Sequence, residues 1–321
     1  MALNAKTMTN KELFYGHKAC PGCGAALAIR LALKLPRGQV CPGKRPPVLS
    51  LQHDFLALKV LGERTIAVMP PNCMSTVAFI YPHMPLYVNG MIPPFAGTAA
   101  AMSGILAGAK AQGLEDYHVV GFAGDGGTAD IGLQALSGMI DRNDKAIFIC
   151  YDNEAYMNTG VQKSGLTPYG MKTTNTPSGK NFHGSQSSKK RMFEIVAAHG
   201  IPYAATASLG YPEDFMAKVE KAMNTDGTSY IHVMAPCPTG WGTPTDVTID
   251  IGKEAVDCGL WYLAEYENGK FKINRDPKEF TSVEDYLKKQ SRFANFDAHD
   301  FERVIAERDA TWNRIRNDWN K

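Results

Sequence analysis

Short runs of hydrophobic residues alternate with amphipathic segments through the middle of the chain. The apolar runs predict buried strands at 117–123, 145–151, 202–207 and 230–235. The segments between them place apolar residues at helical spacing and predict helices at 131–140, 190–199 and 212–223. Apolar strands that alternate with helices are typical of an α/β fold, in which a parallel sheet is covered by helices on both faces.

A second pattern is the absence of charge between Thr65 and Ala109, where 45 residues include no Asp, Glu, Lys or Arg. A membrane-spanning helix needs about 20 predominantly apolar residues in succession. Six prolines interrupt this stretch, and the helix that it predicts, at 99–110, is too short and has side chains too small to span a bilayer. We therefore expect these residues to form buried interior, with no membrane span.

Charge is concentrated at the C-terminal end. Residues 253–321 include 27 charged residues among 69, which divides the chain into a body at 1–252 and a charged C-terminal extension at 253–321. Apolar residues at helical spacing predict a helix that packs on the body or on another subunit: Phe301, Val304, Ile305, Trp312, Ile315 and Trp319. Within the body, residues 160–190 form a polar loop, and a loop of that length is typically functional.

The overall charge excludes one class of partner. With 34 basic and 32 acidic residues and no basic block, the chain has no electrostatic signature of nucleic-acid binding. Its N-terminal sequence includes no apolar run typical of a signal peptide. Seven cysteines in 321 residues are too few for a disulfide scaffold, so we expect a reducing, cytoplasmic environment in which paired cysteines serve metal binding or catalysis.

Polar residues follow two of the predicted strands. The sequence GDGG, at 124–127, follows one strand, and Asn153 follows the next strand along the chain. The carboxyl ends of neighbouring parallel strands are where α/β folds bind ligands. The carboxylate of Asp125 and the carboxamide of Asn153 offer oxygen ligands for Mg²⁺, and the glycines let the backbone approach a diphosphate. The pattern GDG-x26-N therefore resembles the motif that binds thiamine diphosphate and magnesium.

The cysteines predict a second centre. Cys20 and Cys23 form a CxxC turn, which alone is compatible with zinc, an iron–sulfur cluster or a redox dithiol. Cys73 and Cys237 each follow an apolar strand and have a proline nearby. Structural zinc usually takes two CxxC-like pairs, so this dispersed pattern of two, one and one favours a [4Fe–4S] cluster.

Three cysteines are left outside this set. Cys41 is the alternative to Cys73 as a ligand. Cys150 lies within an apolar run and is expected in the core, whereas Cys258 has no partner nearby in sequence.

Over nearly its full length the chain resembles the β subunits of 2-oxoacid:ferredoxin oxidoreductases, especially the pyruvate branch. The motifs that carry this resemblance occur in the expected order: GHKACPGCGAALAIR, PPNCMS, GDGGTADIG, DNEAYMNTGVQKSG, TPYG, AAHGIPY and APCPTGW. One departure is local, because residues 36–48 are longer and richer in proline than the usual pattern.

The resemblance implies a parallel-sheet, thiamine diphosphate-binding fold for residues 1–252 and a defined set of site residues. It implies that the ligands of one [4Fe–4S] cluster are Cys20, Cys23, Cys73 and Cys237. It implies that the Mg²⁺ ligands are Asp125, Asn153 and the backbone carbonyl of Ala155, and that Asn158 is a catalytic residue that faces the reactive carbon of thiamine and the substrate. The cofactor-binding residues that it implies are Gly97, Thr98, Gly124, Asp125, Gly126, Gly127, Asn153, Ala155 and Asn158.

The implied activity is oxidative decarboxylation of a 2-oxoacid, with pyruvate favoured, to acyl-CoA and CO₂, with electrons passed through [4Fe–4S] clusters to ferredoxin. The resemblance also implies α, γ and δ partner subunits, or fused equivalents. Within the family, the alternatives are oxalate, aryl or branched-chain 2-oxoacids. A non-redox thiamine-dependent decarboxylase or ligase would leave four cysteines without a role, and a metal-stabilised binding module would leave Asp125 and Asn153 without one.

Overall fold

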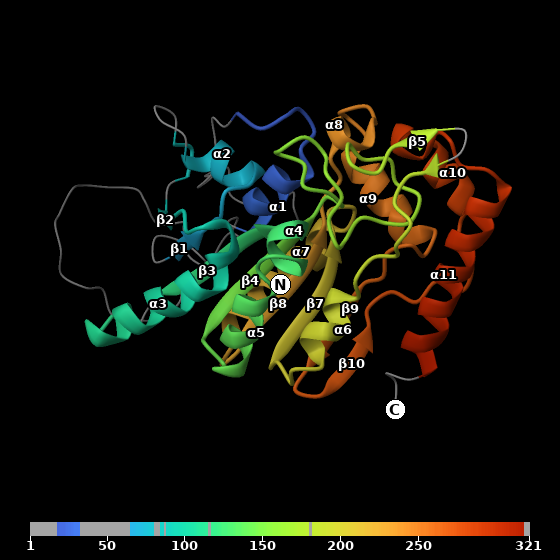
Figure 1. Ribbon diagram of the computed structural model, residues 1–321. Coiled ribbons are helices and arrows are strands. Elements are labelled where there is room, and N and C mark those ends of the chain that lie inside the picture. The colour runs from blue at the N-terminus through green and yellow to red at the C-terminus, as the bar shows by residue number, and fades with distance from the viewer. Residues whose placement is uncertain are drawn as a thin grey trace.

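The computed structural model describes residues 18–32, 65–79, 84–86, 88–114, 117–179 and 182–317, and Figure 1 shows their arrangement. These residues form an eight-stranded sheet in the order β10-β9-β7-β8-β4-β3-β1-β2, and a separate ribbon of two strands, β5 and β6. The strands from β7 to β2 are parallel, whereas β9 and β10 are antiparallel at one edge. The predicted parallel α/β fold is therefore confirmed.

The strands are β1 (Thr65–Val68), β2 (Asn89–Met91), β3 (His118–Gly124), β4 (Ala146–Asp152), β5 (Ser178–Gly179), β6 (Phe182–His183), β7 (Tyr203–Ser208), β8 (Ser229–Met234), β9 (Ala264–Glu267) and β10 (Lys270–Ile273). The α-helices are α1 (Gly24–Ala32), α2 (Cys73–Phe79), α3 (Thr98–Ala111), α4 (Asp125–Ala129), α5 (Leu133–Asp141), α6 (Met192–Ala197), α7 (Pro212–Asn224), α8 (Pro238–Trp241), α9 (Thr248–Asp257), α10 (Val283–Lys288) and α11 (Ala298–Asn317). Two 3₁₀ helices are η2 (Phe95–Gly97) and η3 (Ser291–Phe293). The predicted strands and helices of the body are confirmed to within two residues at either end.

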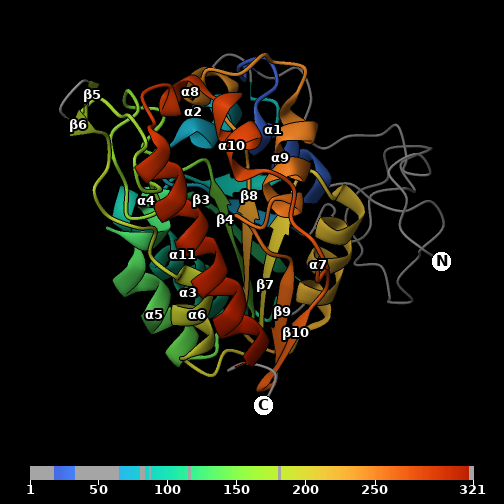
Figure 2. The ribbon, with the colours of Figure 1, turned by 90° about the vertical axis from the view of Figure 1, so that its right-hand side faces the viewer.

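The central strand β4 shows why its sequence is apolar from Ala146 to Cys150. Side chains alternate between the two faces of a strand. Ile147 and Ile149 belong to the core beneath α1 and α7, whereas Phe148 and Cys150 belong to the core beneath α3, α5 and α6. Figure 2 shows these two groups of helices on opposite sides of the sheet. Because both faces are covered, both sets of side chains must be apolar.

The C-terminal extension contributes to the sheet as well as covering it. β9 pairs with β7, and β10 pairs with β9. This hairpin is absent from the strands predicted above, although the positive φ values of Asn268 (48°) and Gly269 (84°) mark a turn that is typical of two-residue hairpins. α11 packs on the chain's own body through the buried side chains of Trp312 and Ile315, and Trp319 lies outside the described residues.

The uncharged stretch at 65–109 is not entirely the buried interior that its composition predicts. Val68 of β1 is fully buried, but Met91 and Ile92 are 46% and 48% exposed. The part of α3 beyond Met102 is exposed or half-exposed. The physical reason is that α3 consists mainly of alanine and glycine, which expose little apolar area, so this helix tolerates solvent with Lys110 as its one charged residue.

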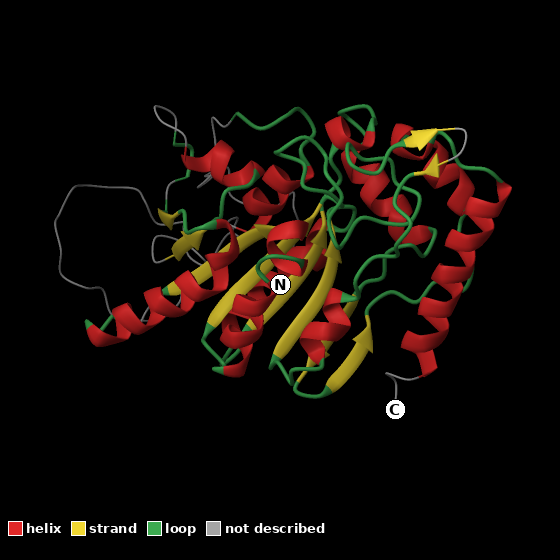
Figure 3. Ribbon diagram, viewed as in Figure 1, coloured by secondary structure: helices red, strands yellow, loops and turns green. Residues whose placement is uncertain are grey.

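The carboxyl ends of the parallel strands meet at one edge of the sheet. Figure 3 shows loops and short helices gathered beyond the arrowheads at this edge. The long loop at 160–190 reaches the same edge, since Ser164 bonds to Asp125 there. In the part of the chain that the structure describes, no helix combines the length and the apolar character that crossing a membrane requires.

Candidate functional site

Four neighbouring strands, β1, β3, β4 and β8, carry predicted ligands at their carboxyl ends. Cys73 begins α2 after β1, Asp125 begins α4 directly after β3, and Asn153 directly follows β4. Cys237 follows β8 and precedes α8. These strands are adjacent and parallel, so their ends bring the four residues to one edge of the sheet. One cavity at this edge is lined by Cys73, Asp125 and Asn153 together.

Asp125 is a buried carboxylate. Its side chain is 2% exposed, and Ser164 from the long loop donates a hydrogen bond to its Oδ2. Burial and the nearby Asp152 raise the pKa of Asp125 well above its usual range, and they outweigh the opposite effects of Ser164 and Lys189. A cation bound to Asp125 would favour its ionised form and remove this cost.

Two further oxygen-bearing groups, the carboxamide of Asn153 and the carbonyl of Ala155, lie beside this carboxylate. One end of the Asn153 carboxamide lies 3.1 Å from Oδ1 of Asp125 and 3.0 Å from the carbonyl oxygen of Ala155. With nitrogen at that end, the amide donates hydrogen bonds to both oxygens. With oxygen at that end, the Asn153 oxygen lies from each of the other two oxygens at about the spacing of adjacent Mg²⁺ ligands, which is about 2.9 Å for octahedral Mg–O bonds of about 2.1 Å. The residues present therefore fit this ion.

The glycines after β3 form a wall of the same cavity. Gly124, Gly126 and Gly127 all line it. A Cβ atom on Gly126 would lie 2.1 Å from the ring of Tyr156. That ring is held by a hydrogen bond of 2.9 Å from its hydroxyl to Oδ2 of Asp130. The absence of a side chain at Gly126 is therefore required for the backbone and Tyr156 to approach each other.

The CxxC turn lies against the segment that carries Cys237. The backbone N–H of Cys23 donates to the carbonyl oxygen of Cys20 at 3.1 Å, which closes the turn. The backbone N–H of Gly24 donates to the carbonyl oxygen of Pro236 at 3.0 Å. The first residue of α1 is thus bonded to the residue directly before Cys237.

The four thiols lie within electrostatic range of one another. Burial raises the pKa of Cys73 to about 12, and the negative charges of Cys23, Cys237 and Cys20 act in the same direction. Burial likewise raises the pKa of Cys237 to about 11, with contributions from Cys23 and Cys20. Four thiolates so placed require a positively charged group among them, and the donor set fits a metal centre.

Asn158 lies in the cavity wall next to Cys73. It lines the same cavity as Cys73 and Asp125. Its Nδ2 donates to Oγ1 of Thr76 at 3.3 Å. A hydrogen bond from its side chain to the Cys73 sulfur lowers the pKa of Cys73, although burial outweighs this effect. The carboxamide therefore contacts the segment that carries a predicted cluster ligand.

Other residues named from the sequence lie elsewhere. Gly97 and Thr98 do not line this cavity, and Thr98 is buried against β3. Cys150 is fully buried in β4, as expected. Cys258 is buried after α9, where its Sγ contacts the carbonyl oxygen of Ala255 at 3.5 Å. Cys41 and the proline-rich loop around it lie outside the described residues.

A network of charged side chains beside Asn153 is not revealed by the sequence motifs. Asp152 contacts Nε2 of His232 at 3.0 Å and Nζ of Lys189 at 2.8 Å. Lys189 also donates to Oε1 of Glu154 at 2.8 Å, and Arg292 forms an ion pair with Oε2 of Glu154 at 2.6 Å. Burial acts to raise the pKa of Asp152, but Lys189 and His232 outweigh it, so the pKa falls to about 2.

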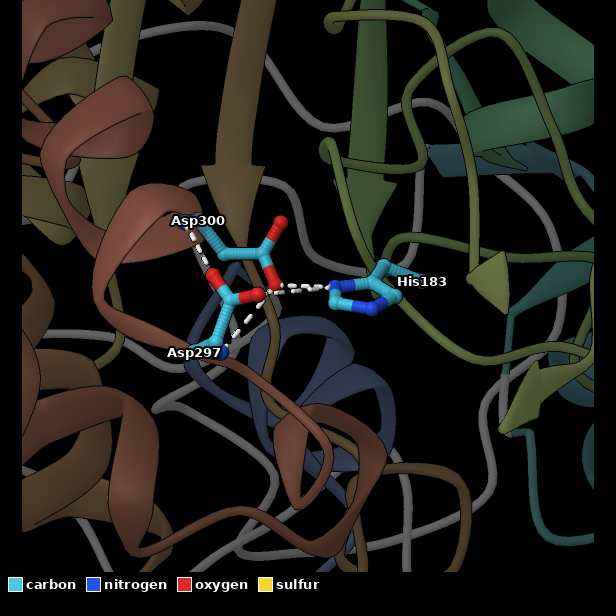
Figure 4. A group of neighbouring side chains, drawn as sticks. All are labelled: His183, Asp297 and Asp300. Carbon is cyan, nitrogen blue, oxygen red and sulfur yellow. Dashed lines mark hydrogen bonds and ion pairs between the residues drawn. The ribbon is translucent and has the colours of Figure 1, made fainter. Parts of the chain in front are cut away.

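A second titratable cluster joins the β5-β6 ribbon to the start of α11, and Figure 4 shows its three side chains. Nδ1 of His183 lies 2.5 Å from Oδ2 of Asp300 and 4.0 Å from Oδ2 of Asp297. The hydroxyl of Tyr169 donates to Oδ1 of Asp300 at 2.9 Å. Asp300 raises the pKa of His183 through its hydrogen bond and charge. These contacts connect the long loop to the C-terminal extension.

The chain is similar to known proteins over most of its length. Residues 73–233 match the family described as thiamine pyrophosphate enzyme, C-terminal TPP binding domain. The chain is 44% identical over 301 residues to pyruvate synthase subunit PorB of Methanothermobacter thermautotrophicus, which covers 94% of this chain and 96% of that protein. It is 45% identical over 313 residues to ketoisovalerate oxidoreductase subunit VorB of Pyrococcus horikoshii, covering 95% and 93% of the two chains.

A solved structure shares the fold. The 2-oxoglutarate:ferredoxin oxidoreductase from Magnetococcus marinus, with 2-oxoglutarate, coenzyme A and succinyl-CoA bound, matches with a TM-score of 0.53 and 16% identity over 94% of each chain. This likeness concerns the arrangement of the strands and helices. The family-model match spans Asp125 and Asn153 and begins at Cys73, whereas Cys20, Cys23 and Cys237 lie outside it.

Proposed function

The chain belongs to the family of β subunits of 2-oxoacid:ferredoxin oxidoreductases, and on that premise we propose that it holds thiamine diphosphate, Mg²⁺ and one [4Fe–4S] cluster at the carboxyl edge of its sheet. The observation that carries the proposal is that Cys73 and Asp125 line one cavity. A thiol set and a Mg²⁺-type oxygen set thus adjoin each other. That arrangement suits an enzyme in which electrons from a substrate pass directly to a cluster.

In this proposal Asp125, Asn153 and the carbonyl of Ala155 hold Mg²⁺, and the backbone at 124–127 faces the diphosphate. When bound, thiamine diphosphate supplies an electron sink for decarboxylation, and a [4Fe–4S] cluster accepts electrons singly. Ser164 holds the Asp125 carboxylate in place through its hydrogen bond. Asn158 orients the substrate by hydrogen bonding from the cavity wall.

The thiols are not as close as zinc ligands must be, which favours a cluster over zinc at Cys20, Cys23, Cys73 and Cys237. Tetrahedral zinc with Zn–S bonds of about 2.3 Å holds its sulfurs roughly 3.8 Å apart. Among the described residues, no three cysteine sulfurs lie within 4.8 Å of one another. The group of three potential metal ligands that meets this distance is His183, Asp297 and Asp300. A cubane of four irons separates its cysteine ligands more widely. Iron and acid-labile sulfide analysis of anaerobically purified protein tests this assignment, and zinc without iron would overturn it.

Pyruvate is the proposed substrate, with coenzyme A as acyl acceptor and ferredoxin as electron acceptor. The motifs resemble the pyruvate branch, and one relative is a pyruvate synthase subunit. A branched-chain 2-oxoacid is the second candidate, because a ketoisovalerate oxidoreductase subunit is similar to the same extent. Steady-state assays with pyruvate, 2-oxoisovalerate, an aryl 2-oxoacid and oxalate separate these substrates. We expect the highest kcat/KM with pyruvate; a higher value for another acid would reassign the substrate.

We further propose that the site is completed by partner α, γ and δ subunits, or fused equivalents. Thiamine needs a carboxylate beside its aminopyrimidine ring. Among the described residues that line the cavity, Asp125 is the one carboxylate, and the proposal assigns it to Mg²⁺. The isolated chain, supplied with cluster, Mg²⁺, thiamine diphosphate, pyruvate, coenzyme A and a viologen, is therefore expected to be inactive. Turnover comparable to that of the assembled complex would refute the shared site.

A further inference from the structure

The segment that contains the proposed Mg²⁺ ligands turns sharply at Glu154. This residue has a φ of 70°, a left-handed conformation that side chains other than glycine rarely adopt. The turn lies between Asn153 and Ala155, so it determines whether the Asn153 side chain and the Ala155 carbonyl both face Asp125. Strained backbone of this kind persists where surrounding contacts hold it.

Arg292 supplies such contacts at two points, directly at Glu154 and through Trp241 at the carbonyl of Asn153. Its guanidinium is 3% exposed and forms an ion pair of 2.6 Å with Oε2 of Glu154, the residue after Asn153. Its Cζ also lies 3.7 Å from the centre of the Trp241 ring. The indole N–H of Trp241 donates to the carbonyl oxygen of Asn153 at 2.9 Å. One buried cation from η3 therefore fixes both the peptide of Asn153 and the side chain that follows it.

We propose that Arg292 is a positioning residue for the Mg²⁺ site, which it acts on through Glu154 and Trp241. This inference rests on the proposed function of Asp125, Asn153 and Ala155 as Mg²⁺ ligands. It gives the C-terminal extension a role at the site, because η3 lies within that extension. Groups that hold metal ligands from behind typically change metal affinity 10- to 100-fold when they are removed.

A purely electrostatic effect of Arg292 would change the Mg²⁺ affinity in the opposite direction. The direction of the change therefore distinguishes the two explanations. Arg292 is a cation, so if it acted only through its charge, its removal would strengthen the binding of Mg²⁺. The ionisable groups that face it are Glu154, which it contacts, Lys189, which shares that carboxylate, and the thiol of Cys237. If Arg292 positions the ligands, its removal weakens Mg²⁺ binding instead.

The test uses Arg292→Met and Arg292→Lys, each in the assembled protein as purified, stripped of Mg²⁺ and saturated with thiamine diphosphate. Titration calorimetry with Mg²⁺ measures the affinity, and circular dichroism with thermal unfolding checks the fold. We expect roughly 10- to 100-fold weaker binding for Arg292→Met and a smaller loss for Arg292→Lys, which keeps the charge but not the planar stack. The control is Arg303→Met, since Arg303 also stacks on an aromatic ring, 3.7 Å from the centre of Tyr169, and its ion pair is with Glu307 rather than with this segment.

Unchanged or tighter Mg²⁺ binding by a folded Arg292→Met protein would overturn the proposal. If that variant does not fold, Trp241→Phe provides the second test, because it keeps a ring for the stack and removes the bond to Asn153. Trp241→Phe is expected to weaken Mg²⁺ binding severalfold, and unchanged affinity would overturn the proposal as well. The wild-type titration is separate: absence of Mg²⁺ binding there would refute the proposed Mg²⁺ ligands themselves.

Discussion

The indole N–H of Trp241 donates a hydrogen bond of 2.9 Å to the backbone carbonyl oxygen of Asn153. The backbone N–H of the same tryptophan donates to the carbonyl oxygen of Cys237 at 2.8 Å. Trp241 therefore bonds to a proposed Mg²⁺ ligand and to a proposed cluster ligand. Because the ring is fully buried, this connection is rigid, and it fixes the spacing between the strand ends that carry the two centres.

Replacing Cys73 with alanine is expected to remove most of the iron and acid-labile sulfide, because Cys73 interacts with the three other proposed cluster ligands. Cys258→Ala is the control, since this free thiol is buried away from the site, after α9, and contacts Ala255. Cys41→Ala is expected to keep its iron too. The measurement is iron and sulfide per chain after anaerobic purification, and equal loss in the Cys73 and Cys258 variants would contradict the assignment.

A methyl group at Gly126 is expected to disrupt the cofactor site. Its Cβ would lie 2.1 Å from the Tyr156 ring, which cannot move freely because its hydroxyl bonds to Asp130. Gly126→Ala should weaken thiamine diphosphate binding at least tenfold and reduce the free energy of unfolding by about 1–3 kcal/mol. Calorimetry and denaturant unfolding measure the two effects.

The control for this change is Gly104→Ala in α3, where a Cβ would meet no atom within 4 Å. An exposed helix gains about 0.5–1 kcal/mol when alanine replaces glycine, so this variant should be slightly more stable than the wild type and bind the cofactor equally well. If Gly126→Ala behaved in the same way as Gly104→Ala, the steric account of Gly126 would be wrong.

The contact between His183 and Asp300 is expected to stabilise the fold more in mildly acidic than in alkaline solution. Asp300 raises the pKa of His183 above its ordinary value of 6.5, so the contribution of the imidazolium is complete below pH 6.5 and is lost as the pH rises through the raised pKa. The pKa of Asp300 is lowered from 3.8, because His183 and Tyr169 outweigh its burial, so its own contribution is lost only in more acidic solution.

The difference in thermal midpoint between the wild type and His183→Gln should therefore be larger at about pH 6 than at about pH 9. Backbone hydrogen exchange in β6 and the first turn of α11 should likewise be faster in His183→Gln than in the wild type, with a larger difference at about pH 6 than at about pH 9. His199→Gln is the control, because Ser137 rather than a carboxylate is the side-chain partner of His199. A difference between wild type and His183→Gln that does not vary with pH would show that the ion pair adds nothing.

The sheet and the location of the site follow from local patterns. The strands before Asp125 and Asn153 are apolar except for His118 at the start of β3 and the last residues of β4, because both of their faces are buried, and this apolar run makes them visible in the sequence. Parallel neighbours end at the same edge, so the positions of Asp125 and Asn153 directly after strands predict that they meet. The same reasoning predicts that Cys73 and Cys237, which also come after parallel strands, lie at this edge.

The contacts that hold the segment with the proposed Mg²⁺ ligands could not be predicted in this way. Arg292 and Glu154 are far apart in sequence, and no helical or strand period connects them. The hairpin of β9 and β10 is also missed, because each strand has four residues and includes charged side chains at the sheet edge. The sequence feature that indicates this hairpin is the two-residue turn at Asn268 and Gly269, not an apolar run.

Reduction of the cluster by substrate is the measurement that bears most directly on the proposed function. The assembled protein, with Mg²⁺ and thiamine diphosphate but without ferredoxin, is mixed anaerobically with pyruvate and followed by electron paramagnetic resonance. We predict a reduced [4Fe–4S] signal in the wild type and none in Asp125→Ala, although dithionite reduces the cluster in both. An Asp125→Ala protein whose cluster is reduced by pyruvate at the wild-type rate would contradict the account.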